Sequence, residues 1–228
     1  MAKLWSFGCS HTAGYELGND KDYIAWFNRY GNKRKEEWYT HINKCTTPDL
    51  AWAGRLADKL NLEHISKARN GNGIDRCMLA VTEESNNIDW DNDVVVLGCP
   101  PPGRWMGLTN DDMNVILGDI PDDIMYGMVE GEKKVSYWME YLPKIDTQEM
   151  FHVGVVTLIK TKYPKIKLIK LYDNSYMYED ASIYENDIGL WDIALRDNIS
   201  HPKYPGGHFI EEVHEKLAIE LIKTGVGQ

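Results

Sequence analysis

The pattern of apolar and polar residues predicts four strands in this chain. The clearest is DVVVLG at 93–98, and KLWSFG at 3–8 leads directly into a tight turn. The segments LEHISKA at 62–68 and KIKLIKLYD at 165–173 are the two other predicted strands. A strand that is apolar at consecutive positions is usually buried on both faces, as in a parallel sheet.

Helical periodicity falls between and after these runs. It predicts helices over 48–61, 74–85, 147–164 and 207–225. Pro48 falls near the first turn of the first helix, where its missing N–H removes no hydrogen bond. In the last helix one face carries four large apolar side chains, namely Phe209, Val213, Leu217 and Leu221.

Strands and helices therefore alternate along the chain, which predicts one α/β domain over residues 1–228. The expected architecture is a three-layer α/β/α, flavodoxin-like sandwich with a parallel sheet of four or five strands. Ligands of such sheets bind beyond the carboxyl ends of the strands. The turns expected at that edge are GCSHTAG, ARNGNG, GCPPPGR and the segment before the last helix.

Two long aperiodic segments interrupt this pattern, at 15–47 and 105–145. Both leave the predicted sheet at its carboxyl edge, and both carry aromatic residues. We therefore expect them to form a cap over the active-site crevice and to line it with aromatic side chains, which suits a sugar or an aromatic ring. The aromatic residues concerned are Trp26, Phe27, Trp38, Trp105 and Tyr126.

Composition narrows the class of function. Twenty-five basic against thirty-five acidic residues give a net charge of −10 with no basic cluster, so nucleic acid is not an expected partner. No apolar run is long enough to span a membrane. Four widely spaced cysteines without a Cys-x-x-Cys pair indicate reduced thiols and a cytoplasmic protein. No metal-binding spacing or dinucleotide fingerprint is present, so we expect neither metal nor cofactor.

Three of the turns, read together, resemble those of a known family. FGCSHTAG follows the first strand, a Gly/Asn turn follows the second, and HP followed by GH precedes the last helix. This order resembles the SGNH (GDSL-like) hydrolases, and most closely their short phage-encoded versions. The resemblance covers the scaffold but not the two aperiodic segments.

The resemblance implies a serine esterase site. It implies that Ser10 is the nucleophile, His201 the general base and Gly71 a backbone oxyanion donor. Asn198 stands where the family usually has its acid, so Asp197 is the candidate to orient His201. The place of the family's oxyanion asparagine reads CPPPGR, whose prolines offer no N–H, and Arg104 is the candidate donor there.

A second interpretation stands beside each of these roles. Ser10 can be an ordinary turn serine, His201 a loop histidine and Asp197 a surface charge. His208 opens the last helix and is interpreted as a packing or hydrogen-bonding residue, and His11 as a side chain pointing away from the serine.

The predicted function is hydrolysis of an acyl or acetyl ester of a carbohydrate or small metabolite, in the host cytoplasm or a virion if the protein is phage-encoded. The alternative is a non-catalytic SGNH-like protein, either a structural or accessory phage component or a carbohydrate-binding module. A flavin- or nucleotide-binding protein is disfavoured because the first turn lacks a glycine-rich phosphate loop. The sequence leaves the oligomeric state open.

Overall fold

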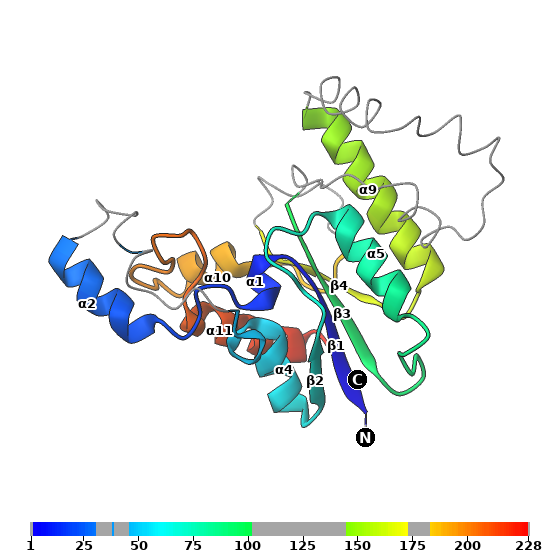
Figure 1. The fold of residues 1–228 in the computed structure, drawn as a ribbon, viewed down its shortest axis with the longest axis horizontal. Coiled ribbons are helices and arrows are strands. Elements are labelled where there is room, and N and C mark those ends of the chain that lie inside the picture. The colour runs from blue at the N-terminus through cyan, green and yellow to red at the C-terminus, as the bar shows by residue number, and fades with distance from the viewer. Residues whose placement is uncertain (1, 31–37, 39–45, 102–144, 173–182, 228) are drawn as a thin grey trace.

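The computed structural model describes residues 2–30, 38, 46–101, 145–172 and 183–227. Within them lies a four-stranded sheet in the order β2-β1-β3-β4, with every neighbouring pair parallel (Figure 1). The parallel α/β architecture expected from the alternating pattern is confirmed. The strands are β1 (Lys3–Gly8), β2 (Glu63–Ser66), β3 (Val94–Cys99) and β4 (Lys167–Lys170).

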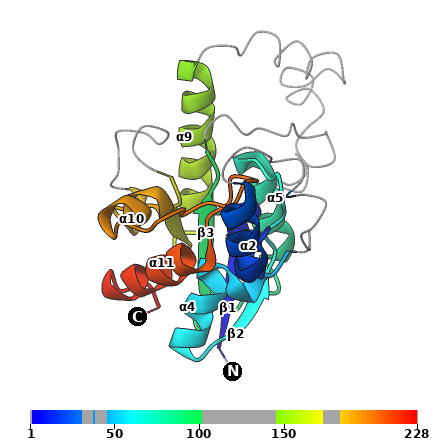
Figure 2. The same ribbon diagram turned by 90° about the vertical axis from the view of Figure 1, so that its left-hand side faces the viewer.

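Helices cover both faces of the sheet (Figures 1 and 2). Side chains of the central strands alternate between them, so Phe7, Val95 and Leu97 pack into one buried cluster and Leu4 and Val96 into the other. The first cluster lies under α5 (Ile74–Glu84) and α9 (Ile145–Lys162). The second lies under α4 (Trp52–Leu60), α10 (Leu190–Arg196) and α11 (Glu211–Lys223).

The periodic segments became helices with shifted ends. Pro48 does not open the first long helix but a separate 3₁₀ turn, η2 (Pro48–Leu50), and α4 begins only at Trp52. The last helix begins at Glu211, four residues later than expected, because Lys203 and Phe209 form an isolated antiparallel bridge. Its predicted apolar face is confirmed, since Phe209, Val213, Leu217 and Leu221 are all buried.

Part of the first aperiodic segment is ordered around its own core. It forms α2 (Asp20–Tyr30), whose Tyr23 and Trp26 pack with Trp38 and with Tyr204 from the loop before α11. Tyr204 also donates a hydrogen bond to the Asp20 carboxylate. Nearly all of the second segment, with Trp105 and Tyr126, lies outside the described residues, so the expected cap stays a prediction.

Three of the four cysteines lie in the described part of the chain, and Cys9, Cys77 and Cys99 are buried free thiols there. Burial raises the pKa of the Cys77 and Cys99 thiols above their usual value. None of the described helices combines the length and the apolarity needed to cross a membrane.

Candidate active site

Ser10 is the first residue of a four-residue helix, α1 (Ser10–Ala13), directly after β1. Two glycines let this helix sit on the ends of the central strands. A Cβ at Gly8 or at Gly98 would overlap the Thr12 hydroxyl, and at Gly98 it would also lie 2.9 Å from the Trp52 ring. The small residues around GCSHT thus fix where Ser10 leaves the sheet.

The Ser10 side chain is fully buried, and its Oγ has no hydrogen-bond partner among the described residues. A buried hydroxyl without a partner costs about 1–3 kcal/mol, so a native structure rarely keeps one without reason. The Thr12 hydroxyl is also unpartnered, but it is enclosed by Gly8 and Gly98 at the strand ends. Ser10 is therefore the candidate nucleophile of α1.

The turn that carries Gly71 lies beside the end of β1. The Arg69 N–H donates to the Gly8 carbonyl at 3.1 Å, and the Asn72 side-chain amide donates to the same oxygen at 3.4 Å. Gly71 has φ +81°, and a Cβ there would contact no atom within 4 Å. The structure therefore joins the first two turns at one sheet edge, and the oxyanion role of Gly71 stays a prediction.

The residues proposed as base and orienter contact other side chains in the structure. The His201 side chain is exposed, and its ring contacts that of Phe27 of α2 with 3.7 Å between ring centroids and the two planes tilted by 41°. No hydrogen bond or ion pair of the described residues joins His201 to Ser10 or to Asp197. The positive φ of His201, +55°, marks the tight path of this loop.

Asp197 belongs to a surface ion cluster. Its carboxylate accepts hydrogen bonds from Arg196 at 2.7 Å and from Lys216 at 2.9 Å. These two partners lower the pKa of the Asp197 carboxyl to about 2. In this arrangement the carboxylate holds α10 against α11, and its orienting role stays a prediction. Arg104 lies outside the described residues.

Another histidine, His208, lies beside α1 and contacts His11 of that helix. The ring of His11, which follows Ser10 in the chain, has its centroid 5.0 Å from that of His208 and 5.5 Å from that of Tyr172. The Nδ1 atom of His208 lies 2.6 Å from the Glu16 carboxylate. Sequence reasoning took His208 for a packing or hydrogen-bonding residue, and no local motif points to Glu16 as its partner.

His214 is a structural histidine of α11. Its Nδ1 accepts a hydrogen bond from the backbone N–H of Trp52 at 3.1 Å, which satisfies a donor at the start of α4. Burial, with smaller contributions from Arg55 and His208, lowers the pKa of His214 to about 3. The ring is therefore neutral at physiological pH.

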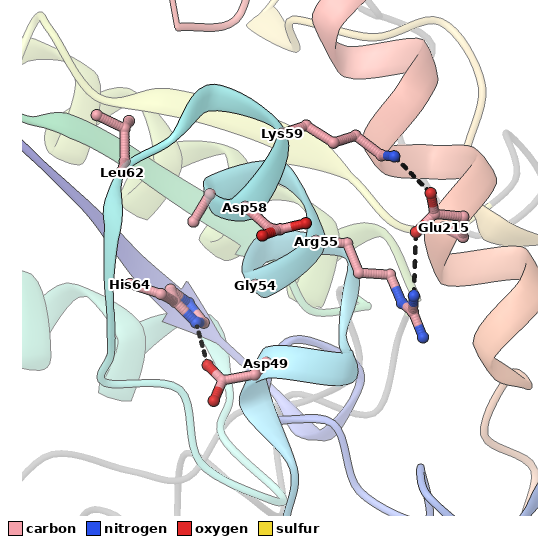
Figure 3. Close-up of a pocket in the computed structure, with 9 residues that line it drawn as sticks. Asp49, Gly54, Arg55, Asp58, Lys59, Leu62, His64 and Glu215 are labelled. Carbon is pink, nitrogen blue, oxygen red and sulfur yellow. Dashed lines mark hydrogen bonds and ion pairs between the residues drawn. The ribbon is translucent and has the colours of Figure 1, made fainter.

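A serine, a histidine and a carboxylate are also linked by hydrogen bonds beside α4. The histidine and the carboxylate, His64 and Asp49, line a polar pocket of about 530 Å³ (Figure 3). His64 Nε2 is 2.9 Å from Ser6 Oγ, and His64 Nδ1 is 3.1 Å from Asp49. Ser6 is fully buried inside β1 and does not line the pocket. These hydrogen bonds therefore connect β1, β2 and η2.

This hydrogen-bonded set of Ser6, His64 and Asp49 is separate from the Ser10 turn. In the register of β1 and β2, His64 is level with Leu4. Gly8 lies four positions beyond Leu4, a distance of about 13 Å along β1. The other charged residues at the pocket are largely paired with one another, since Glu215 binds both Arg55 and Lys59.

Comparison with known proteins gives similarities in structure only. No protein family matches the chain, and no curated protein matches it. One similar solved structure is a carbohydrate esterase whose active site displays divergent catalytic and non-catalytic binding functions, with 16% identity and a TM-score of 0.49. That alignment covers 97% of this chain but 64% of the other, so the chain spans less than two thirds of that protein.

Two further solved structures are similar to a lower degree. A family two carbohydrate esterase from Clostridium thermocellum is 12% identical, with a TM-score of 0.44 and coverage of 99% of this chain and 63% of that one. A GDSL-like lipase from Parabacteroides merdae is also 12% identical, with a TM-score of 0.43 and coverage of 100% and 96%.

No group of three or more His, Cys, Asp or Glu side chains in the described part of the chain is placed to hold a metal ion. The chemistry available at the Ser10 edge is that of a hydroxyl, imidazole rings and backbone N–H groups.

Proposed function

We propose that this protein is a serine-dependent ester hydrolase and that Ser10 is its nucleophile. The observation that carries the proposal is the buried Ser10 hydroxyl at the exit of the central strand β1, which has no hydrogen-bond partner in the described part of the chain. The proposed substrate is an acyl or acetyl ester of a carbohydrate or small metabolite. Because the hydroxyl is fully buried, an ester reaches it only when the side chains around it move aside.

The proposed reaction is acyl transfer through Ser10. Its Oγ attacks the ester carbonyl while a histidine takes the proton, because a serine hydroxyl is inert until a base removes it. The N–H groups of Ser10 and Gly71 are the proposed oxyanion donors, with Arg104 as a further one. Each donor of this kind typically contributes about 10²–10³ in kcat. Two histidines are candidates for the general base. One is His201 with Asp197 as its orienting carboxylate, and the other is His208 with Glu16 in that role.

A non-catalytic, carbohydrate-binding role is the second candidate. It is favoured by one observation: no hydrogen bond among the described residues joins Ser10 Oγ to a histidine. In this case the Ser10 turn is a remnant of a catalytic site, and the protein holds a glycan without cleaving it.

Labelling with a fluorophosphonate probe distinguishes the two roles. We expect the wild-type protein to be labelled and to hydrolyse p-nitrophenyl acetate, and Ser10→Ala to lose both. Ser6→Ala is the matched control, because Ser6 is an equally buried serine hydrogen-bonded to a histidine. A wild-type protein that is neither labelled nor active leaves the binding role. Loss of labelling in Ser6→Ala alone moves the site to the pocket beside α4.

A further inference from the structure

Glu16 is a buried carboxylate whose two oxygens are both engaged. Oε1 accepts a hydrogen bond from the Trp38 indole N–H at 2.8 Å, and Oε2 faces His208 Nδ1 at 2.6 Å. The Glu16 side chain is fully buried and its φ is +69°, in the left-handed region that residues other than glycine rarely adopt. Strained positions of this kind cluster at functional sites, where the surrounding structure maintains them.

The loop before α11 leaves room for this carboxylate. A Cβ at Gly206 would overlap both carboxylate oxygens of Glu16. Position 206 therefore requires glycine, because any side chain there would overlap the Glu16 carboxylate. The same loop carries His208 two residues later, so one short segment both covers the carboxylate and presents the imidazole to it.

This contact sets the tautomer of His208. A carboxylate only accepts hydrogen bonds, so Nδ1 carries the proton in the pair and the lone pair of the neutral ring lies on Nε2. No hydrogen bond from the described residues occupies Nε2. Two rings contact that of His208, with its centroid 5.0 Å from that of Tyr15 and 5.0 Å from that of His11.

We infer that His208 is the general base of the Ser10 site and that Glu16 is its positioning residue. The inference rests on the proposed function. Of the two competing histidines, His208 has its ring against that of His11 in α1, the neighbour of Ser10 in the chain, whereas the His201 ring contacts Phe27 of α2. Glu16 then does for His208 what Asp197, engaged by Arg196 and Lys216, does not do for His201.

The reaction then runs in two balanced steps. In the first, the Ser10 proton passes to His208 Nε2, Oγ bonds to the acyl carbon, and the ester C–O bond breaks as the alkoxide takes the proton from the imidazolium. In the second, a water gives its proton to Nε2, its oxygen bonds to the acyl carbon, and the acyl–Oγ bond breaks as Ser10 recovers the proton. The buried Glu16 carboxylate stabilises the imidazolium in both steps.

Four variants test the assignment on the full chain with p-nitrophenyl acetate and the fluorophosphonate probe. We expect His208→Ala to lower kcat about 10³-fold or more while His201→Ala retains turnover, and we expect free imidazole to restore part of the activity of His208→Ala. A merely structural histidine would give no such rescue. We expect Glu16→Gln to lower kcat by about 10²–10⁴-fold at an unchanged KM, as loss of an orienting carboxylate does elsewhere.

The fourth variant, Gly206→Ala, places a methyl group against the Glu16 carboxylate. We expect it to lower kcat as Glu16→Gln does, whereas Gly154→Ala, whose Cβ would meet no atom within 4 Å, leaves turnover unchanged. Thermal unfolding of each variant shows that it is folded. Turnover lost in His201→Ala and retained in His208→Ala overturns the inference and leaves the proposed function standing. If the wild-type protein neither turns over ester nor takes the probe, the proposed function itself fails.

Discussion

At the scale of single residues, the Ser10 turn depends on positions where no side chain fits. Gly98 ends β3 beside β1, and a Cβ there would overlap Thr12 Oγ1 and press on the side chains of Trp52 and Leu171. The short helix α1 is seated by this close approach rather than by its own hydrogen bonds, since it has only four residues. Glycine at 98 is therefore a condition for the position of Ser10.

We expect Gly98→Ala to lower the free energy of unfolding by about 1–3 kcal/mol, because an extra methyl in a filled core forces neighbours aside. Chemical denaturation measures this change. Since the displaced neighbours include Thr12, two residues from Ser10, the variant should also react more slowly with a fluorophosphonate probe. Unchanged stability would show that α1 can shift without cost, and the argument for a fixed Ser10 would then fail.

At the scale of elements, local periodicity was enough for most of the fold. All four strands of the sheet were predicted to within a few residues. The two central strands, β1 and β3, were the clearest, because a strand buried on both faces is apolar at most positions. The helices α10 and α2 were not predicted with their bounds. The first is only seven residues long, and the second buries just Tyr23 and Trp26 of its eleven residues, so neither shows a clear apolar face.

In helix α9, replacing a glycine is expected to stabilise the protein, in contrast to Gly98→Ala. Gly154 lies in its interior on an exposed face, and a Cβ there would contact nothing within 4 Å. We expect Gly154→Ala to stabilise the protein by about 0.4–1 kcal/mol, because alanine loses less backbone freedom on folding. For a chain of this size that raises Tm by roughly 2–4 °C per kcal/mol, which calorimetry measures. A lower Tm would mean that this face of α9 is covered.

At the scale of the whole molecule, the candidate site depends on contacts between distant parts of the chain. Sequence order placed Ser10 and the Gly71 turn at one edge, because both follow strands of a parallel sheet. It did not give the pair of Glu16 and His208, which are 192 residues apart. Glu16 lies in an aperiodic segment and Gly206 is one of several turn glycines, so only the folded chain shows why each is needed.

Long-range burial also gives the whole molecule a sensitivity to acid. His214 and His152 are buried, and burial lowers their pKa values to about 3 and about 4. In the unfolded chain both titrate near 6.5, so between about pH 6.5 and pH 4 the unfolded state binds more protons than the folded one. Stability that is complete above pH 6.5 is therefore lost as the pH falls through this window.

We expect the free energy of unfolding to fall by about 2 kcal/mol per buried histidine between pH 7 and pH 5, a range above the titration of most carboxylates. Urea denaturation at a series of pH values measures the slope. His214→Asn is the informative variant, because its side-chain oxygen can still accept from the Trp52 N–H that His214 Nδ1 binds. Between pH 7 and pH 5, we expect the free energy of unfolding of this variant to fall by about 2 kcal/mol less than that of the wild-type protein. A variant as sensitive to acid as the wild-type protein would show that His214 becomes protonated without leaving the folded core.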